Sequence, residues 1–268
     1  MLQDKEVVSM FTGSVWEYLQ EVMKNHGVTH LTLIDPDPQR QKPEQAAQIA
    51  HYATKAGSDG IMVGGSIARL LLDDTVKSIK KKTDKPIILF PGNVNGLSEY
   101  ADAVFFMSLL NSHNPYFIMG AQVLSAFTIK SLKLEPISMA YLIIDPGAAA
   151  GYIGEARLLP RNKPSITAAY ALAAQYLGFN LVYLEAGSGA DQSVPLAIVK
   201  AVKQEINIPV LVGGGIETAN QAVDLVNAGA DMIVQGTFVE RSVMEDGGKA
   251  LNSIITEIKK AGKKRKNK

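Results

Sequence analysis

The chain contains eight short runs rich in apolar and β-branched residues, and segments with helix signals separate successive runs. We expect strands at His30–Ile34, Gly60–Val63, Pro86–Phe90, Ala103–Met107, Met139–Ile144, Leu181–Glu185, Pro209–Val212 and Met232–Gln235. Because each run is almost continuously apolar, both faces of each strand must be buried, as in a parallel sheet covered by helices. Strands that alternate with helices through short connections predict a single-domain (βα)₈ TIM barrel over residues 1–258.

An internal repeat supports this architecture. Residues 56–65 read AGSDGIMVGG, and residues 228–237 read AGADMIVQGT. Both segments are typical of a helix end, a glycine cap, an aspartate turn, a buried strand and a glycine at the strand's carboxyl end. Repeated βα units favour a closed barrel over the alternative, a doubly wound open sheet. No Gly-x-Gly-x-x-Gly follows the first strand, which argues against a dinucleotide-binding fold.

Length and composition are compatible with one large domain. The chain has 268 residues, of which 47% are hydrophobic, close to the roughly 250 residues of a typical barrel. It has no cysteine, which excludes disulfides and cysteine-based metal sites and favours a reducing compartment. Neither a signal peptide nor a run long enough to span a membrane is visible in the sequence, so we expect a cytoplasmic protein.

Charge is concentrated at the C-terminus. The net charge is +1, yet residues 259–268 hold seven basic residues and no acidic one, which leaves 20 basic and 26 acidic residues elsewhere. We interpret 259–268 as a disordered, solvated tail. The alternative is a contact with an anionic lipid surface or nucleic acid. The four histidines, at 26, 30, 51 and 113, show no metal-ligand spacing and are interpreted as structural.

Glycine-rich loops follow the last two predicted strands. Gly213-Gly214-Gly215 comes after the seventh strand, and Gly236-Thr237 comes after the eighth. Glycine lets main-chain N–H groups approach an anion closely, and a following helix N-terminus adds a favourable dipole. These two loops are the usual phosphate site of a TIM barrel. The sequence therefore predicts an enzyme that acts on a small phosphorylated substrate.

A carboxylate stands at the end of the sixth predicted strand, beside the expected phosphate. Glu185 is followed by Ala186-Gly187-Ser188-Gly189, so the strand leads directly into another glycine-rich loop. A carboxylate at this place could accept hydrogen bonds from substrate hydroxyls or remove a proton from one. The alternative is a structural glutamate that pairs with a lysine or arginine in the barrel mouth.

The first two predicted strands end in a second pair of polar groups. Asp35 ends the first strand, and Ser66 follows the second. One carboxylate and one hydroxyl on neighbouring strand ends suit Mg²⁺, which takes its remaining ligands from water and substrate phosphates. Asp35 could instead be only a turn residue. Asp73-Asp74 superficially resembles the aspartate pairs of terpenoid enzymes but lies in a predicted surface helix, so we interpret it as a solvated face.

The fifth predicted strand leads into Asp145-Pro146-Gly147 and then a long loop, 148–163. Its alanines and glycine could admit a bulky apolar ligand, and Arg157, Arg161 and Lys163 could attract a diphosphate, although a plain excursion is the simpler interpretation. Asp145 also allows another enzyme class, in which Asp35 and Asp145 form an acid–base pair in an isomerase or cyclase of histidine or tryptophan biosynthesis. A non-catalytic barrel that binds membrane or nucleic acid through its tail is the third possibility.

Taken together, the strand-end motifs resemble those of the geranylgeranylglyceryl phosphate synthase family, in its larger group. The resemblance runs from about residue 14 to residue 260, and YLEAGSG, residues 183–189, is its most diagnostic part. The smaller group carries a lysine two residues before the first-strand aspartate, where this chain has Leu33. The other matching segments are LTLIDP (31–36), IMVGGS (61–66), FFMSLLNS (105–112) and GGG (213–215).

The resemblance implies an Mg²⁺-dependent transfer of a prenyl group from a polyprenyl diphosphate to the 3-hydroxyl of sn-glycerol 1-phosphate. It implies that Asp35 and Ser66 hold the metal and that Glu185 and Asp35 are catalytic. It also implies a homo-oligomer, a dimer or hexamer, and no nucleic-acid partner. The glycerol phosphate would be bound by Tyr183, Leu184, Glu185, Ala186, Gly187, Ser188, Gly189, Gly214, Gly215, Gly236 and Thr237. Candidates for an apolar prenyl groove, though more typical of core, are Phe105, Phe106, Tyr116, Phe117 and Tyr141.

Overall fold

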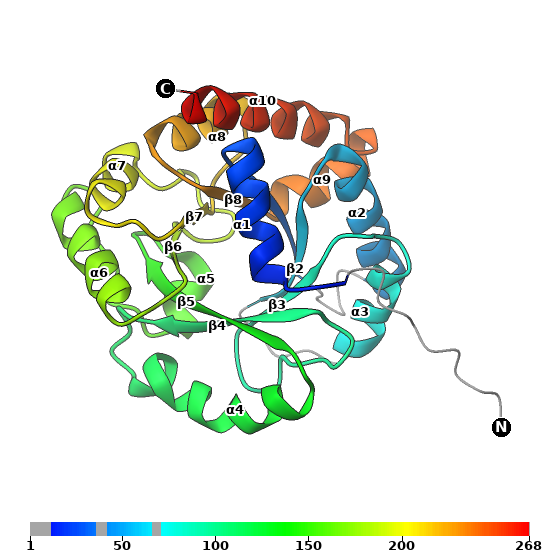
Figure 1. Ribbon diagram of the computed structural model, residues 1–268, viewed down its shortest axis with the longest axis horizontal. Helices are drawn as coiled ribbons and strands as arrows, with labels where there is room; N and C mark the ends of the chain where they lie inside the picture. Colours follow the sequence, from blue (N-terminus) through cyan, green and yellow to red (C-terminus); the bar gives the residue numbers. More distant parts are fainter. Residues whose placement is uncertain (1–11, 36–41, 66–70, 268) are drawn as a thin grey trace.

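In the computed structural model, which describes residues 12–35, 42–65 and 71–267, the chain forms a closed barrel of eight parallel strands (Figure 1). Each strand pairs with the next one along the chain, and the last pairs with the first through Thr32 and Gln235. The barrel prediction is confirmed, with strand ends shifted by a few residues. The strands are β1 Thr29–Ile34, β2 Gly60–Gly65, β3 Ile87–Pro91, β4 Ala103–Leu109, β5 Glu135–Ile143, β6 Leu181–Glu185, β7 Val210–Gly213 and β8 Met232–Gln235.

A ring of helices surrounds these strands, but it is incomplete on one side. Residues 92–102 join β3 directly to β4, and this described stretch forms no helix. The predicted long loop after β5 is partly helical, because residues 148–153 form a short helix. The helices are α1 Val15–His26, α2 Pro43–Ala56, α3 Leu72–Lys80, the π-helix η1 Tyr116–Gly120, α4 Ala121–Ser131, α5 Ala148–Ile153, α6 Pro164–Tyr176, α7 Leu196–Glu205, α8 Ala219–Ala228, α9 Thr237–Asp246 and α10 Lys249–Lys266.

Alternate strand residues divide the core into two layers. Side chains such as Leu31, Phe105 and Tyr183 fill the barrel interior. Their neighbours, such as Ile34 and Leu184, pack outward against the helices. This alternation decides which side chains can reach the open mouth. Asp73 and Asp74 lie exposed on α3, as the sequence predicted. Among the described residues, no helix has both the length and the apolar character needed to cross a membrane.

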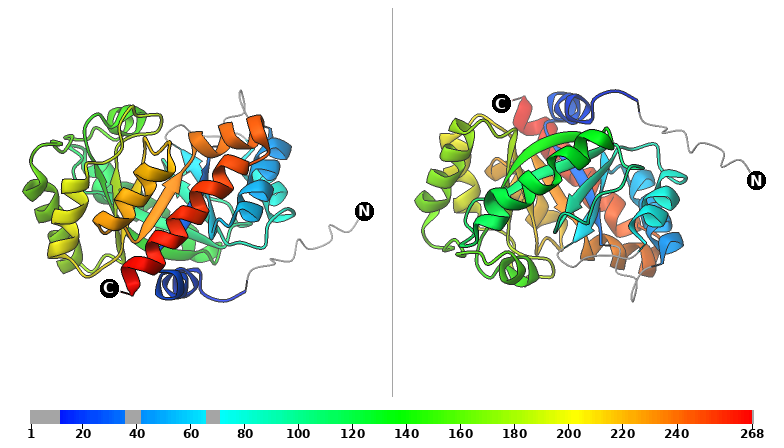
Figure 2. Two further views of the ribbon diagram at one scale, coloured as in Figure 1. Left: turned by 90° about the horizontal axis from the view of Figure 1, so that it is seen from above. Right: turned by 90° about the horizontal axis from the view of Figure 1, so that it is seen from below.

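The amino ends of the strands are closed by helix α1, which lies at the opposite end of the barrel from α9 (Figure 2). Val15 and Leu19 of α1 are buried and belong to the interior cluster. The carboxylate of Glu135, at the start of β5, accepts hydrogen bonds from the main-chain N–H groups of Val15 at 2.6 Å and Trp16 at 3.0 Å. A negative charge at a helix N-terminus is favourable, so Glu135 fixes this plug.

Aspartates immediately before three strands connect the amino ends of neighbouring strands. Asp59, Asp102 and Asp231 precede β2, β4 and β8, and each accepts the N–H of a residue that begins or borders the adjacent strand. Each also forms an ion pair with a lysine, which is Lys259, Lys80 or Lys203 respectively. The aspartates of the internal sequence repeat are therefore structural groups of the amino end.

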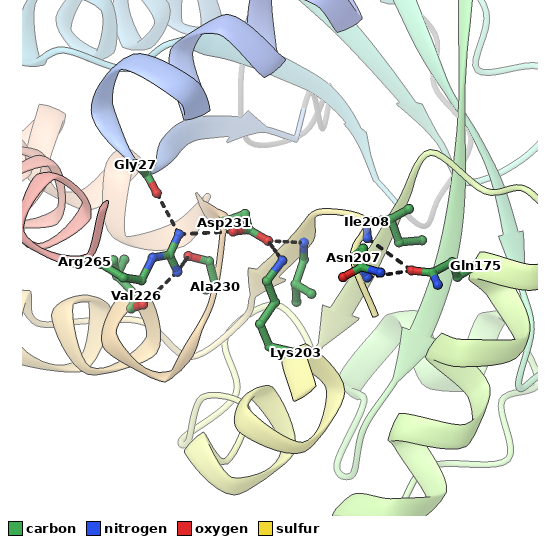
Figure 3. A network of polar contacts seen from close by, with 10 residues as sticks. Gly27, Gln175, Lys203, Asn207, Ile208, Val226, Ala230, Asp231 and Arg265 are labelled. Atoms are coloured by element: carbon green, nitrogen blue, oxygen red, sulfur yellow. Dashed lines mark hydrogen bonds and ion pairs between the residues drawn. The ribbon is translucent and has the colours of Figure 1, made fainter. Parts of the chain in front are cut away.

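The basic C-terminal residues belong to α10, which continues to Lys266, so the expectation of a disordered tail is wrong for 259–266. Arg265 donates to Asp231 at 3.1 Å and to the carbonyl oxygens of Gly27, Val226 and Ala230 (Figure 3). The helix approaches α1 closely, because a Cβ on Gly27 would collide with the carbonyl group of Gly262. Arg265, one of the basic residues expected to be solvated, thus holds α10 against the barrel.

Candidate active site

Two hollows lie at the carboxyl ends of the strands, where a TIM barrel carries its active site. The first, which we call the phosphate pocket, lies over β6, β7, β8 and the end of β1. The second, which we call the apolar groove, lies over β2 to β5 and helix α4. The phosphate pocket is lined by Leu33, Tyr183, Glu185, Ser188, Gly189, Gly214, Gly215, Ile216, Glu217, Val234, Gln235, Gly236, Thr237 and Phe238.

The phosphate pocket is formed by the two glycine loops that the sequence singled out. Gly214 and Gly215 have φ values of +81° and +64°, a conformation that glycine adopts without strain. Helix α9 begins at Thr237, so the N–H groups of its first turn have no acceptor within the helix. These N–H groups and the helix dipole favour an anion at this place.

Glu185 lies in the wall of this pocket and is only 5% exposed. Its carboxylate accepts hydrogen bonds from the Tyr183 hydroxyl and, at 2.6 Å, from the main-chain N–H of Gly187. Burial raises the pKa of Glu185, and those hydrogen bonds offset part of the increase. Gly214 must be a glycine here, because a Cβ would collide with the carboxylate oxygen.

The alternative role of Glu185, as a structural ion-pair partner, finds no support. Within the described ranges, no lysine or arginine forms an ion pair with Glu185, and its hydrogen-bond donors are uncharged. A carboxylate with a raised pKa, a lining position and no cation is more typical of a proton acceptor than of a structural group.

The predicted substrate-binding residues of β6 divide between two environments. Tyr183, Glu185, Ser188 and Gly189 line the phosphate pocket. Leu184 and Ala186 are fully buried in the outer core, so their side chains face the helices and not the pocket. The physical reason is the alternation of a strand, which turns every second side chain away.

Three aromatic rings connect the two hollows. Tyr183 lines the phosphate pocket, whereas Tyr141 and Phe90 line the apolar groove. The Tyr141 and Tyr183 ring centroids are 5.0 Å apart, and Phe90 lies 5.6 Å and 5.8 Å from them. Burial, followed by the nearby Glu185 charge, raises the pKa of both tyrosines, which therefore remain protonated. The packed rings thus lie between the two hollows, and Glu185 lies on the side of the phosphate pocket.

The apolar groove runs outward through the gap in the helix ring. Asn93, Val94 and Leu97 come from the helix-free connection between β3 and β4, and residues of α4 such as Ala121 and Ile129 line the same groove. Four of the five aromatic candidates line the groove, namely Phe105, Phe106, Phe117 and Tyr141. Tyr116 does not; its hydroxyl donates to the side chain of Asn93 at 2.5 Å.

The sequence indicated this part of the groove only in outline. Ala150, Ile153 and Gly154 line it, in the segment whose alanines and glycine were expected to admit an apolar ligand, but residues 148–153 form a helix where a loop was expected. Gln122 and Ser125 of α4 also line it.

Asp35 directly follows β1. Leu33 of β1 lines the phosphate pocket, and the neighbouring strand β2 contributes Gly65 to the apolar groove. Asp35 itself is exposed and lines neither hollow. Ser66 lies outside the described residues. The described part of the chain contains no cluster of three or more metal-ligating side chains. A single carboxylate fits Mg²⁺, which commonly uses one or two carboxylates together with substrate phosphates.

Asp35 and Asp145, the acid–base pair expected for an isomerase or cyclase, do not lie in either hollow. Both aspartates are exposed. Arg161, a candidate for attracting diphosphate, is used structurally. It donates to the carbonyl oxygen of Asp145 at 3.1 Å and to that of Ser193 at 2.8 Å, which connects the loops after β5 and β6.

The fold and site define a phosphate-binding TIM barrel that carries an apolar groove beside its phosphate pocket. Residues 20–261 match the model of the PcrB family. The chain is 50% identical to the geranylgeranylglyceryl phosphate synthase of Thermococcus sibiricus over 250 residues, which cover 92% of this chain and 97% of the relative. The enzyme of the same name from Methanosphaera stadtmanae is 53% identical over 230 residues, or 85% and 93% of the two chains.

Solved structures agree with these sequence relationships. (S)-3-O-geranylgeranylglyceryl phosphate synthase from Thermoplasma acidophilum, in complex with its substrate sn-glycerol-1-phosphate, superposes with a TM-score of 0.88 at 47% identity, covering 93% of this chain and 100% of the other. The tryptophan synthase alpha chain of Legionella pneumophila, at 13% identity and a TM-score of 0.58, covers 94% and 98% and shares the fold alone. The chain therefore belongs to the PcrB family, in which its close relatives are geranylgeranylglyceryl phosphate synthases.

Proposed function

We propose that this protein transfers a geranylgeranyl or similar polyprenyl group from its diphosphate to the 3-hydroxyl of sn-glycerol 1-phosphate. The products are an ether-lipid precursor and diphosphate. One observation carries the proposal: a phosphate pocket and an apolar groove lie on either side of packed aromatic rings, and the phosphate pocket holds a buried carboxylate that pairs with no cation among the described residues. The names of the relatives and the substrate of the Thermoplasma acidophilum enzyme support the same reaction.

The phosphate pocket positions the acceptor substrate. The N-terminus of α9 and the loop at Gly214 and Gly215 would hold the phosphate group of glycerol phosphate. Its glycerol part then extends toward Tyr183 and Glu185, which line the same pocket. Fixing the acceptor in this way places its hydroxyl at attack distance and lowers the entropic part of the barrier.

Glu185 accepts the proton of the reacting hydroxyl. The glycerol oxygen forms a bond to C1 of the prenyl group, the bond from C1 to the diphosphate oxygen breaks, and the proton moves to the Glu185 carboxylate. The raised pKa makes this carboxylate a stronger base than an exposed glutamate. Tyr183 and Gly187 hold the carboxylate in one orientation throughout.

Asp35 and Ser66 would hold Mg²⁺, as the sequence predicted. When bound there, the ion would offset the charge of the diphosphate and make it a better leaving group. Asp35 would contribute the negative charge from the position directly after β1, next to the strand whose Leu33 lines the phosphate pocket. The apolar groove would bind the prenyl chain, because its lining is largely hydrophobic and excludes water from C1.

A homo-oligomer, dimer or hexamer, is part of the proposal. Helix α4 and the turn before it expose large apolar side chains, among them Val123 and Phe127, the latter 86% exposed. A contiguous apolar patch of this kind is typical of a protein contact surface. Light scattering at micromolar concentration should give the mass of a dimer or hexamer; the mass of a monomer would contradict this part.

The test of the reaction is a competition among prenyl donors. The protein is incubated with sn-glycerol 1-phosphate, Mg²⁺ and a mixture of prenyl diphosphates from geranyl to heptaprenyl, and the products are weighed by mass spectrometry. We expect one dominant prenylglyceryl phosphate, a loss of product when the metal is chelated, and little product from sn-glycerol 3-phosphate. The absence of product with every donor would overturn the proposed function, and equal kcat/KM for the two enantiomers would contradict the assigned contacts.

A further inference from the structure

A line of buried polar side chains lies just outside the barrel wall, behind the phosphate pocket, and the reaction above does not use it. It consists of Thr32 and His30 of β1, Ser58 before β2, and Gln235 at the end of β8. All four are almost completely buried, with exposed fractions of 0% to 3%. Polar groups are costly to bury, so four together in a helix–sheet interface indicate a role for their hydrogen bonds.

The line ends on the glycine-rich loop after β7. The side-chain Nε2 of Gln235 donates to the carbonyl oxygen of Ile216 at 2.8 Å. Ile216 immediately follows Gly214 and Gly215, and both Ile216 and Gln235 line the phosphate pocket. Gln235 also immediately precedes Gly236, where helix α9 is capped. This one side chain therefore joins the two loops between which the phosphate would bind.

The carbonyl oxygen of Ile216, at one end of the line, fixes which atom donates in each hydrogen bond. A carbonyl oxygen can only accept, so the Gln235 amide must present its nitrogen to Ile216 and its oxygen to His30. The Oε1 of Gln235 lies 3.2 Å from Nε2 of His30, which must then carry the proton. Nδ1 of His30 becomes an acceptor, 3.1 Å from the hydroxyl of Ser58, which in turn lies 3.1 Å from that of Thr32.

His30 is suited to this task because it stays neutral. Burial lowers its pKa to about 3, with the hydrogen bond to Gln235 opposing the shift. A neutral imidazole has one donor and one acceptor nitrogen, so it can donate to Gln235 and accept from Ser58. From the sequence, His30 was interpreted as structural because the histidines lack metal-ligand spacing. Its hydrogen bond to Gln235 adds a second role, that of orienting this side chain.

Consecutive glycines have more conformational freedom than other residues, so ordering this loop costs more entropy than ordering a loop without them. An anchor from outside the loop reduces that cost before the ligand binds. We infer that Gln235, oriented by His30, is a positioning residue that holds the Gly214-Gly215 loop and the start of α9 in the relative arrangement that binds phosphate. The inference rests on the proposed function, because it assigns the phosphate to glycerol phosphate.

The test compares ligand binding with stability. Gln235→Met keeps the length of the side chain but removes both hydrogen-bonding groups. We expect the Kd for sn-glycerol 1-phosphate, measured by titration calorimetry, to rise about tenfold or more, the usual scale for losing one ordering hydrogen bond to a pocket. The KM for the prenyl diphosphate should change less than about twofold, because the apolar groove contains none of these residues.

Two histidine variants test the orientation of the amide. The side-chain amide of a glutamine can take the place of Nε2 of a histidine, so His30→Gln should preserve the donor to Gln235 and keep the Kd near that of wild type. His30→Leu removes the donor and should raise the Kd. Equal effects of the two changes would contradict the orienting role of His30.

A matched control separates positioning from simple loss of stability. Ser138→Ala removes a hydroxyl that lies 2.6 Å from Oδ1 of Asn180 at the amino end of the barrel. It should lower the melting temperature without changing the Kd. If Gln235→Met also lowers the melting temperature but binds sn-glycerol 1-phosphate as tightly as wild type, the inference is wrong. If wild type itself binds neither this compound nor inorganic phosphate, the proposed function fails, and the positioning role fails with it.

Discussion

The two ends of the barrel use carboxylates in opposite ways. At the amino end, Asp59, Asp102 and Asp231 each accept a main-chain N–H and each face a lysine. At the carboxyl end, Glu185 is more deeply buried than Asp231, yet among the described residues its hydrogen bonds come from a phenol and main-chain N–H groups, and no lysine or arginine pairs with it. The first group neutralises its charge within the protein, whereas Glu185 does not.

This difference separates stability from chemistry. A carboxylate with a cation and an N–H donor keeps its charge at little cost and can join neighbouring strands permanently. A carboxylate buried without a cation destabilises its own charged form, which is the state that can take a proton from a substrate. Substitutions at the two ends should therefore change different measurements, and the following predictions run from the largest expected effect to the smallest.

The largest effect is expected from Glu185→Gln. The amide occupies the same space but cannot take a proton, so kcat/KM for glycerol phosphate should fall about 10²–10⁴-fold. The affinity for the prenyl diphosphate and the melting temperature should change little. Glu205→Gln, at the exposed end of α7, is the matched control and should be active. A Glu185→Gln protein that is unstable but fully active would show that Glu185 is structural.

The pH dependence follows from the same residue. Because the pKa of Glu185 is raised, kcat/KM should fall on the acid side at a pH above the ordinary range of a glutamate. The folded protein binds this proton more tightly than the unfolded chain, so the contribution of Glu185 to the free energy of unfolding decreases as pH rises through the raised pKa. This fall in kcat/KM at low pH should be absent in Glu185→Gln. If the variant shows the same fall at the same pH, another group causes it.

A smaller loss of activity is expected from Asp35→Asn. The nearly isosteric change removes the charge proposed to hold Mg²⁺, so kcat should fall about 10²-fold at low Mg²⁺. Asp73→Asn, on the exposed face of α3, provides a control that should behave as wild type. Wild-type turnover of Asp35→Asn at low Mg²⁺ would refute the metal site, whatever the fate of Glu185.

A substitution at the amino end of the barrel is expected to lower stability and to leave activity unchanged. Asp231→Asn weakens the pairs with Lys203, at 2.6 Å, and Arg265, at 3.1 Å. Breaking a fully buried pair costs about 3–5 kcal/mol, and this one is partly exposed, so we expect about 2 kcal/mol and a melting temperature lower by about 4–8 °C. Activity at 25 °C should be retained. Asp224→Asn, exposed on α8, should shift neither quantity.

The smallest effect is expected from the exposed lysines at the end of α10. Lys263, Lys264 and Lys266 face solvent, whereas Arg265 is partly buried against the barrel. Replacing the three lysines by serine should change the free energy of unfolding by less than about 0.5 kcal/mol. Sedimentation with anionic lipid vesicles tests the predicted membrane contact of this segment. Equal sedimentation of the wild type and the triple variant would contradict that contact.

Much of the fold was predictable because it depends on local patterns. All eight strands were located, since each is a nearly continuous apolar run between polar turns. The start of β5 was missed because Glu135 and Pro136 are polar or disfavoured in strands, although the strand pairs with β4 from Glu135 onward. Helix α5 was missed because its alanines and glycine follow Pro146 and resemble a loop. The helix-free connection between β3 and β4 had no local signal.

For the site, the sequence by itself determined which residues stand at strand ends. Glycines after β7 and β8 and Glu185 at the end of β6 must meet at one mouth, because parallel strands of a closed barrel all end on the same side. It could not show that Leu33 and Gln235 join the pocket wall or that the groove passes through the gap beside α4.

Only the tertiary structure decided which charges are neutralised. Asp231 and Glu185 look alike in sequence, each a single carboxylate at one end of a buried strand. Asp231 receives Lys203 from α7 and Arg265 from α10, residues separated from it by many positions along the chain. Glu185 receives neither, because the helices that carry these cations reach the amino end of the barrel. Ion pairing depends on distance in space, which the packing of helices around the closed sheet sets and the order of residues does not reveal.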